Sequence, residues 1–379
     1  MTLTIFWVCC GLLVYIYVLY PLLVGVLARR FGIPVAHDDV LRKVTIIVSA
    51  YNEASCIRNK LNNLAGLDYP RDLTQILVVS DGSSDATEEI AAAYEVRPVG
   101  VLRIEGRQGK TACQNAAALV AGGEILVFTD ATTQLQADAV RAMVRNFADP
   151  QVGCVGGRLE YVSDVESMTG SGGEAYWSYE TRLRAGESSL GSLIGVSGCL
   201  YAVRKNAYRP MDPGLISDFA IAMKIREQGL RTVLVPEACC FEKTLEDGKR
   251  ELSMRVRVGI RSLNALVRER RFLNPLTYGR FAWQIWSHKL LRYASPFVWI
   301  GALTANAVLM HYGTLYLVLF IGQCALIVAG AAGFMLQDGN RGLGLLAKPY
   351  YFVLTNIASF IAALRYLRGE RMVVWTPIR

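Results

Sequence analysis

Three carboxylates in the N-terminal part of the chain each stand at the end of an apolar, β-prone run. Asp130, Asp81 and Glu53 belong to the segments 127–133, 75–85 and 44–53. Such runs are typical of buried strands, and open α/β sheets place their ligand sites at the carboxyl ends of their strands. Three ordinary strand ends are the alternative, because Asp and Asn are common turn residues. Three such ends in close succession, with helices between them, favour one crevice rimmed by these acids.

The residue types around this crevice indicate what it binds. The sequence Asp130-Ala-Thr132 at a strand end suits a hard divalent metal ion, which takes oxygen ligands. Asp81 can accept hydrogen bonds from a nucleobase or a ribose. Lys110 follows Gly109 at a predicted helix start, where the ammonium and the helix N-terminus can meet an anion. A solvated surface lysine is the alternative for Lys110.

A further carboxylate opens a later helix. Ser217 and Asp218 stand directly before an apolar run that ends near Gln228. Both residues are good N-caps, so a structural role is one interpretation. A carboxylate at this place that faces a cleft can also act as a general base. The sequence leaves both interpretations open.

Three arginines share much of one face of a predicted basic helix. They are Arg255, Arg257 and Arg261, interleaved with Met, Val and Ile. A lipid-facing basic stripe is one interpretation. The other is a set of guanidinium groups that grip a leaving pyrophosphate.

Residues from about 44 to 240 must position these groups. Their alternation of strand and helix patterns predicts a mainly parallel sheet with helices on both faces. The segment 161–191 is rich in Gly, Ser and aromatic residues, and we expect irregular structure there. Strand signals return at 192–203, and Gly229 closes the helix that begins at Ser217. The expected helices are 54–64, 85–94, 110–121, 137–146 and 217–228.

The composition indicates a membrane protein. The chain has 379 residues, an apolar fraction of 53%, a mean hydropathy of +0.29 and a net charge of +8. Lys and Arg crowd beside apolar spans, which points to anionic lipid headgroups and argues against nucleic acid. The nine cysteines show neither a Cys-x-x-Cys pair nor a metal-ligand spacing with His. We expect them to be reduced thiols.

Apolar runs lie at both ends of the chain. The run 5–28 is long enough for one spanning helix, and the arginines that follow it place the next domain in the cytoplasm by the positive-inside rule. Two further spans are expected at 296–310 and 313–335, after interfacial helices at 251–271 and 281–293. The run 350–364 has basic residues on both sides. It is therefore expected to be interfacial or re-entrant, with a third C-terminal span as the alternative.

These patterns divide the chain into five parts. A transmembrane helix at 1–30 precedes a cytoplasmic α/β domain at 40–245, and amphipathic interfacial helices follow at 250–293. Two transmembrane helices are expected at 294–337. The last part, 346–379, holds the short interfacial, re-entrant or spanning helix and a basic C-terminus.

The order of the motifs resembles that of the inverting family 2 glycosyltransferases. More narrowly, it is similar to the membrane-embedded branch with the cellulose, hyaluronan and poly-N-acetylglucosamine synthases. The resemblance covers nearly the whole chain, and its strength lies in the order and spacing of six motifs. These are Ala50-Tyr-Asn-Glu53, Asp81-Gly-Ser-Ser-Asp85, Gly109-Lys110 with Asn115, Asp130-Ala-Thr132, Gly198-Cys199 with Ser217-Asp218, and Arg255-Val-Arg257.

The resemblance implies a GT-A (Rossmann-like) domain and a set of residue roles. Asp218 would be the catalytic general base, and Asp130 would bind Mg²⁺ or Mn²⁺. The donor, a UDP-sugar by expectation, would contact Ala50, Tyr51, Glu53, Asp81, Lys110, Asp130, Arg255 and Arg257. The acceptor side would include Gly198, Cys199 and Ser217.

The implied partners are a nucleotide-sugar donor, a glycan or lipid-linked acceptor and membrane lipids, in the inner or plasma membrane of a bacterium. The sequence names no protein partner. Thr132 stands where the family has a second carboxylate, and Val258 stands where processive synthases have a tryptophan. The missing tryptophan and the few C-terminal spans favour single sugar addition in cell-surface polysaccharide synthesis, whereas Thr132, together with Ser217 in place of the family's usual Glu, would be the sign of a non-catalytic subunit. A processive synthase that exports its polymer and a non-catalytic partner subunit are the alternatives.

Overall fold

The computed structural model describes residues 1–162, 168–243, 248–336 and 346–372. The chain forms two compact units. The sheet unit comprises residues 32–162, 187–243 and 372–379, and the helical unit comprises residues 1–31, 163–186 and 244–371.

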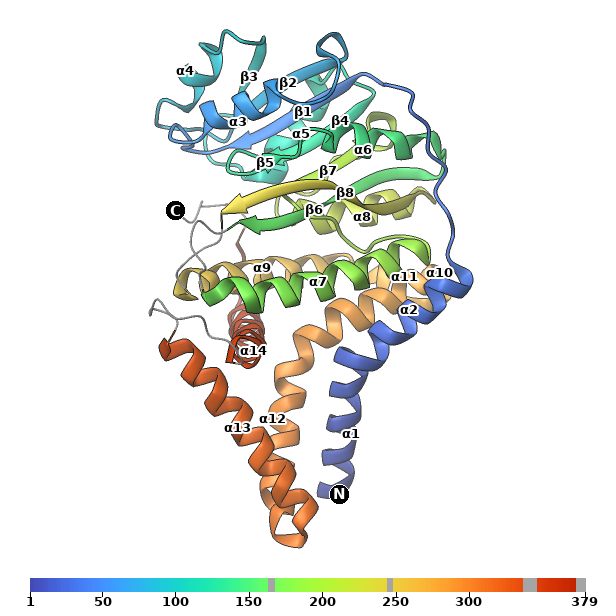
Figure 1. Cartoon of the computed structure of the whole chain (residues 1–379), viewed down its shortest axis with the longest axis vertical. Helices are drawn as coiled ribbons and strands as arrows, with labels where there is room; N and C mark the ends of the chain where they lie inside the picture. The colour runs from blue at the N-terminus through green and yellow to red at the C-terminus, as the bar shows by residue number, and fades with distance from the viewer. Residues whose placement is uncertain (163–167, 244–247, 337–345, 373–379) are drawn as a thin grey trace. The chain divides into compact units, whose positions relative to one another are not determined.

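Among the described residues, the sheet unit contains one eight-stranded sheet in the order β3-β2-β1-β4-β7-β6-β8-β5 (Figure 1). The pairs β1–β2, β1–β4, β2–β3 and β6–β8 are parallel, whereas β7 is antiparallel to both neighbours and β5 to β8. The predicted parallel pairing is confirmed for β3, β2, β1 and β4, but the described sheet as a whole is mixed. The strands are β1 Val44–Ala50, β2 Thr74–Ser80, β3 Val99–Arg103, β4 Ile125–Asp130, β5 Gln134–Leu135, β6 Val152–Val162, β7 Leu200–Arg204 and β8 Arg231–Lys243.

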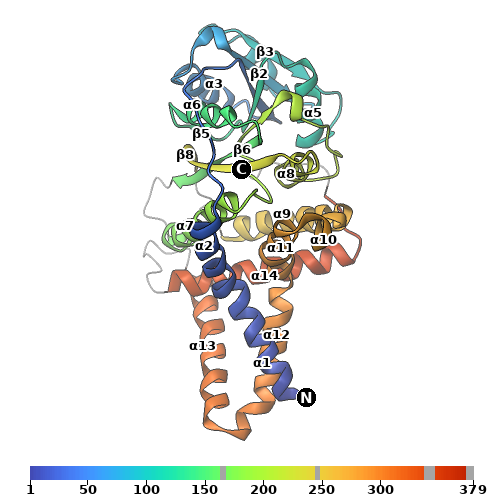
Figure 2. The ribbon, with the colours of Figure 1, turned by 90° about the vertical axis from the view of Figure 1, so that its right-hand side faces the viewer.

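Helices cover both faces of this sheet (Figure 2). The helices α3 and α6 lie on one face, and α5 and α8 lie on the other. All five predicted helices form, with ends shifted by a few residues, and a 3₁₀ turn at Arg145–Ala148 completes the fourth. The bounds are α3 Ile57–Ala65, α4 Thr87–Ala92, α5 Lys110–Val120, α6 Ala139–Val144 and α8 Ser217–Glu227.

The apolar strands bury side chains on both faces, which explains their continuous apolar runs. Ile46 of β1 packs with Ile57 of α3 in one core, and both are fully buried. On the other face Phe128 of β4 stacks on Tyr201 of β7, with ring centroids 4.8 Å apart. The Tyr201 hydroxyl donates to Gln114 Oε1 of α5 at 2.9 Å. This buried polar link fixes α5 against the sheet.

The predicted strand at 192–203 is wrong over most of its length, because β7 begins only at Leu200. The residues before it form a loop whose backbone bonds elsewhere. The Leu193 N–H donates to the Thr232 carbonyl at 2.8 Å, and the Val196 N–H donates to the Asp218 carbonyl at 2.9 Å. These long-range bonds replace a strand ladder.

The segment 161–191 also differs from expectation. The structure shows helix α7 at Met168–Ser189 where irregular structure was expected. One of its glycines, Gly186, marks a close helix contact, because a Cβ there would lie 2.7 Å from Val24 Cγ1 of α2. The packing of helices thus outweighs the weak helix propensity of glycine in this segment.

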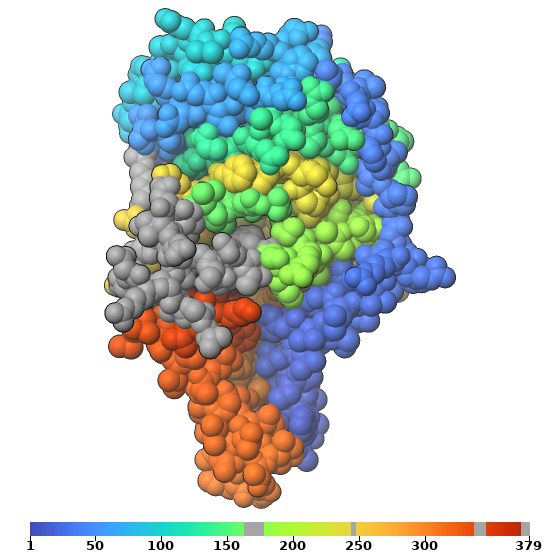
Figure 3. All heavy atoms as spheres, in the orientation of Figure 1, coloured from blue at the N-terminus to red at the C-terminus, as the bar shows by residue number. Residues whose placement is uncertain are grey.

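In the described part of the chain, the helical unit holds four helices that are long and apolar enough to cross a membrane. These are 2–31, 280–312, 314–336 and 347–367. Figure 3 shows the blue N-terminal residues beside the orange residues near position 310, and α1 packs against α12. The bounds are α1 Thr2–Val14, α2 Tyr20–Phe31, α9 Gly248–Arg268, α10 Pro275–Tyr278, α11 Arg280–Gln284, α12 Leu291–Leu309, α13 Thr314–Leu336 and α14 Ala347–Leu367.

Two C-terminal helices differ from the sequence-based division. The segment predicted as a separate helix at 281–293 continues through a π-helical turn, Ile285–Leu290, into α12. The run at 350–364 extends to the 21-residue α14. Within the helical unit α14 lies crosswise to α12 and α13 (Figure 2). The prediction that this helix is interfacial stays a prediction.

A lysine is completely buried in the core of the sheet unit. Lys60 of α3 is fully buried beneath the end of β4. Its Nζ donates to Thr129 Oγ1 at 2.9 Å and to the Thr133 carbonyl at 2.7 Å. Burial lowers the pKa of Lys60 to about 8, although the Asp130 carboxylate opposes this shift. The ammonium therefore holds together the two sides of the turn that carries Asp130.

The depressed pKa of Lys60 predicts that stability rises at alkaline pH. The unfolded chain holds this proton up to the ordinary lysine pKa of 10.5, whereas the folded chain releases it near pH 8. The free energy of unfolding therefore rises between these two values, by about 3 kcal/mol. Thermal melting across this window should show the wild type gaining several degrees relative to Lys60→Met. The exposed Lys43 supplies the control: Lys43→Met should melt in parallel with the wild type, and a parallel curve for Lys60→Met would contradict the prediction.

Candidate active site

The strand order brings the predicted acidic tips together. Strand β1 lies between β2 and β4, and its end pairs Ser49 with Asp130 and Ala50 with Ser80. The Asp81 N–H donates to the carbonyl of Ala50 at 2.9 Å. The ends of the three strands are therefore neighbours at one edge of the sheet, as the sequence predicted.

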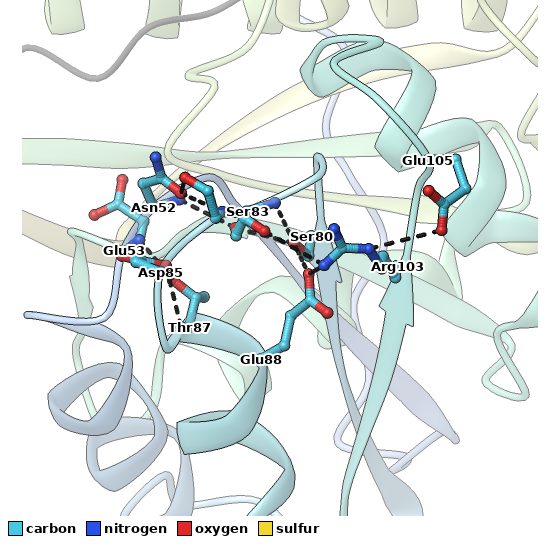
Figure 4. A network of polar contacts seen from close by, with 10 residues as sticks. Asn52, Glu53, Ser80, Ser83, Asp85, Thr87, Glu88, Arg103 and Glu105 are labelled. Carbon is cyan, nitrogen blue, oxygen red and sulfur yellow. Dashed lines mark hydrogen bonds and ion pairs between the residues drawn. The ribbon is translucent and has the colours of Figure 1, made fainter.

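A polar network joins the tips of β1 and β2 (Figure 4). Asn52 has a left-handed φ of 54°, and its Oδ1 accepts from the Ser84 N–H at 2.8 Å. The Asn52 N–H donates to Ser83 Oγ at 3.1 Å, and the Glu53 N–H donates to Thr87 Oγ1 at 2.8 Å. These bonds fix the backbone that follows Tyr51.

Tyr51 and Glu53 project differently from this backbone. The Arg107 guanidinium lies over the Tyr51 ring, 3.7 Å from its centroid. Glu53 is only 2% exposed, and its Oε2 accepts from Cys56 Sγ at 3.1 Å. Tyr51 with Arg107 offers a flat cationic surface, whereas Glu53 is buried.

Asp81 fixes the loop that leads into α5. Its Oδ1 accepts from the N–H groups of Gln108 and Gly109 at 2.8 and 3.0 Å. Gly82 has φ 67°, and a Cβ there would lie 2.7 Å from the Gly106 carbonyl oxygen, so only glycine fits this turn. Asp81 is 2% exposed, and its role toward a nucleoside stays a prediction.

Lys110 joins two segments that are far apart in the sequence. Its ammonium forms an ion pair with Asp130 Oδ1 and donates to the Gly198 carbonyl at 3.0 Å. Burial alone would lower the pKa of Lys110, but Asp130, Cys199 and Asp218 together outweigh burial, and the pKa is raised. Lys110 is therefore charged at neutral pH. The interpretation of Lys110 as a solvated surface lysine is wrong.

Asp218 reaches the same point from α8. A Cβ built on Gly198 would lie 3.3 Å from Asp218 Oδ2 and 3.5 Å from Lys110 Nζ. The N-cap of α8 is Ile216, so the N-cap interpretation of Ser217 and Asp218 is wrong. Ser217 is buried, and Asp218 lies in the first turn.

Helix α5 also holds the segment that leads into α8. Thr111 Oγ1 donates to the Leu215 carbonyl at 2.8 Å. Asn115 Nδ2 donates to the Met211 carbonyl at 2.7 Å, and its Oδ1 accepts from the Met211 N–H at 3.0 Å. Lys110 and Asp218 are therefore held relative to one another through one helix.

Glu242, at the end of β8, is a site residue that the sequence reasoning missed. Its Oε1 accepts from Thr132 Oγ1 at 3.2 Å, and its Oε2 accepts from Cys199 Sγ at 3.8 Å. Burial raises the pKa of Glu242, and the Asp130 carboxylate raises it further. Burial also raises the pKa of Cys199, which therefore stays a thiol. The sequence could have indicated Glu242, because it is an acidic residue near the end of a strand, like Asp81 and Asp130.

Two further residues were missed. Lys60 stands three residues after Ile57 and four before Leu64, and both neighbours are buried, so helical periodicity placed it on the buried face. Arg107 carried no signal, because its contact with Tyr51 depends on the fold of the loop before α5.

The predicted arginines belong to the helical unit. Arg255 pairs with Glu251 at 2.9 Å and donates to the Tyr351 hydroxyl of α14. Arg261 is 7% exposed, so a lipid-facing stripe through all three arginines is wrong. Burial lowers the pKa of Arg257, and Arg261 lowers it further. The predicted donor contacts of Arg255 and Arg257 stay predictions.

The residues around Asp130 fit a hard divalent cation. Asp130, Glu242 and the Thr132 hydroxyl present oxygen donors, which Mg²⁺ and Mn²⁺ prefer. Among the described residues, no group of three His, Cys, Asp or Glu side chains could hold a metal. Mg²⁺ commonly uses one or two carboxylates and completes its shell with substrate phosphates and water. A phosphate-bearing ligand would supply those remaining donors.

All nine cysteines are free, as predicted.

Comparison with known proteins identifies a family model and similar enzymes. Residues 45–210 match the model of glycosyl transferase family 2. Poly-β-1,6-N-acetyl-D-glucosamine synthase of Staphylococcus aureus is 26% identical over 216 residues, which cover 55% of this chain and 52% of that protein. β-Monoglucosyldiacylglycerol synthase of Trichormus variabilis is 30% identical over 168 residues, which cover 43% and 36%. The chain thus matches about half the length of the first of these relatives and about a third of the second.

A solved structure is similar over nearly the whole chain. The mannosyltransferase PcManGT from Pyrobaculum calidifontis, in complex with GDP-Man and Mn²⁺, has a TM-score of 0.74 and 25% identity. The similarity covers 97% of this chain and 100% of PcManGT. The match therefore includes the sheet unit and the apolar helices. The chain carries a family 2 glycosyltransferase domain of the GT-A fold and is a homologue of polysaccharide and glycolipid synthases.

Proposed function

We propose that this protein transfers a sugar from a nucleotide-sugar donor to an acceptor hydroxyl, with inversion at the anomeric carbon. The observation that carries the proposal is the convergence of Lys110, Asp130 and Asp218 around Gly198. Asp130 and Lys110 would serve the diphosphate of the donor, through a bound metal ion and a fixed positive charge. Asp218 would accept the proton of the acceptor hydroxyl.

The donor side is built on β1, β2 and β4. Tyr51 and Arg107 would contact the base, and Lys110 would bind the diphosphate as a fixed cation. Asp130 would hold Mg²⁺ or Mn²⁺, which would neutralise the diphosphate and favour its departure. The relation to PcManGT, solved with GDP-Man and Mn²⁺, supports a nucleotide-sugar.

Asp218 would act as the general base. Its place in the first turn of α8 supports this role, and so does the approach of one of its carboxylate oxygens to Gly198, which Lys110 also contacts. It would accept the proton of the acceptor hydroxyl while that oxygen attacks the anomeric carbon. The bond to the diphosphate breaks on the opposite face, so the configuration inverts.

The acceptor is proposed to be a lipid-linked or glycan hydroxyl at a membrane surface. A polysaccharide synthase and a glycolipid synthase among the relatives support this class. Val258 is 41% exposed on α9, where processive synthases present a tryptophan. This departure supports addition of one sugar over processive polymerisation. Gly198 and Cys199 are proposed to line the acceptor side.

The turnover of donor tests the proposal directly. Purified protein with Mn²⁺ or Mg²⁺ should release nucleoside diphosphate from one member of a panel of UDP- and GDP-sugars. Addition of a lipid extract should increase this release if the acceptor is lipid-linked. Asp218→Asn should lose about 10²–10⁴-fold in kcat and keep donor affinity, because only proton removal is lost.

Two outcomes would contradict these assignments. Near-normal turnover by Asp218→Asn would show that Asp218 is not the general base. If the wild type released no nucleoside diphosphate from any donor, with and without lipid, a non-catalytic partner subunit would be favoured.

Gly198 supplies a second prediction, because it separates Asp218 from Lys110. The methyl group of Gly198→Ala would lie 3.3 Å from Asp218 Oδ2, which is tight and would displace the carboxylate. We expect kcat to fall about tenfold to hundredfold with little change in melting temperature. At Gly66 an added Cβ would be 3.7 Å from its nearest neighbours. Gly66→Ala is therefore the matched control, and an equal loss in both variants would contradict the prediction.

The sheet unit is proposed to face the cytoplasm, with α14 at the inner membrane surface. This follows from the arginines after the first apolar helix and from the absence of Lys and Arg at 309–321, between α12 and α13. In cells treated with a membrane-impermeant maleimide, Tyr312→Cys should be labelled and Arg371→Cys should not. Labelling of Arg371→Cys from outside would show that α14 crosses the membrane. The wild type, with its native cysteines, is the control.

A further inference from the structure

The turn after β4 has one carboxylate where a two-carboxylate motif would have two. Asp130 is followed by Ala131 and Thr132, and Thr132 has a neutral hydroxyl. The structure brings a second acid to the same place from a strand more than a hundred residues later. Antiparallel pairing of β5 with β8 sets Gln134 opposite Phe241, and the next residue of β8 is Glu242.

The contact between Thr132 and Glu242 is direct. Thr132 Oγ1 donates to Glu242 Oε1 at 3.2 Å, so this carboxylate touches the atom that replaces an acidic side chain. Glu242 also acts electrostatically on Cys199 and responds to Asp130, both of which face the same point. The two carboxylates therefore share one environment.

The surroundings leave the charge of Glu242 without a close counter-ion. In the part of the chain that the structure describes, Glu242 takes part in no ion pair, although it is partly buried. Asp130 has one such partner in Lys110. A partly buried carboxylate beside a second one is costly unless a cation joins them.

We propose that Glu242 supplies the second carboxylate for the divalent cation, in place of an acidic residue at position 132. The inference rests on the proposed function and adds a metal-binding residue to it. Asp130 and Glu242 bind the cation from two strands, and Thr132 orients Glu242 through its hydroxyl. Oxygens of the donor diphosphate complete the coordination, as is common for Mg²⁺ sites with few protein ligands.

The test measures Mn²⁺ binding without turnover. Free Mn²⁺ is followed by electron paramagnetic resonance during titration of the purified full-length protein, with UDP and separately with GDP. Glu242→Gln keeps the shape and the hydrogen-bond acceptor but loses the charge. We expect its apparent Kd for Mn²⁺ to rise tenfold or more. Thr132→Asp in the Glu242→Gln background should recover most of this loss, because it restores a second carboxylate.

Matched variants separate coordination from packing. Glu237→Gln changes an exposed glutamate of the same strand and should bind Mn²⁺ like the wild type. Thr132→Val removes only the hydroxyl and should lose less affinity than Glu242→Gln. If Thr132→Val lost as much, and Thr132→Asp with Glu242→Gln did not recover, Glu242 would be only a support for the turn. That result would overturn the inference.

The failure of this inference can be told from the failure of the proposed function. If the wild type releases nucleoside diphosphate and binds Mn²⁺, but Glu242→Gln keeps the wild-type Mn²⁺ affinity, only the role of Glu242 is overturned. If the wild type neither binds Mn²⁺ nor releases nucleoside diphosphate, both the role of Glu242 and the proposed function are overturned.

Discussion

The ammonium of Lys110 is the interaction on which the candidate site depends. It pairs with Asp130 at the end of β4 and bonds the carbonyl of Gly198 in the loop before β7. Asp218 approaches the same glycine from α8. A charged group that is largely buried must find such partners, and breaking a buried pair costs about 3–5 kcal/mol. Lys110 therefore fixes the distance between the donor-side carboxylate and the proposed base.

A second ammonium supports the same turn from the core. Lys60 bonds Thr129 and Thr133, the residues that bracket Asp130. The two ammonium groups thus both act on the Asp130 carboxylate, whereas Glu242 forms no ion pair among the described residues. This partial balance lowers the repulsion between the acidic side chains at this strand edge. It also makes the geometry of the turn depend on charge as well as on packing.

Buried ionic groups recur in the helical unit. Glu180 of α7 pairs with Arg292 of α12 at 2.7 Å and contacts His288 at 2.5 Å. Burial alone would raise the pKa of Glu180, but His288 and Arg292 outweigh burial and lower it well below its usual range. Glu251 and Arg255 of α9 meet Tyr351 of α14. Apolar side chains pack in many registers, whereas such hydrogen-bonded pairs are satisfied in only one. These pairs set the register of α7, α9, α12 and α14.

The sequence by itself determined the class of fold and the acidic strand ends. Apolar runs that end in Asp130, Asp81 and Glu53 are local patterns, and so are the helices that begin at Lys110 and Ser217. Parallel strands have their carboxyl ends at one edge, so these residues could be placed together without coordinates. The departure at Thr132 was also visible, although nothing nearby in the sequence offered a replacement for the missing acid.

The tertiary structure decided which distant groups meet. The pairing of β5 with β8 brings Glu242 to Thr132. The loop before β7 donates N–H groups to the carbonyls of Thr232 and Asp218 instead of pairing with a neighbouring strand. Helix α7 forms in a glycine-containing segment because Gly186 packs against Val24 of another helix. Each of these features depends on a contact between segments far apart in the chain. Local sequence propensity does not predict such contacts, because they stabilise the structure only when the two distant segments have come together.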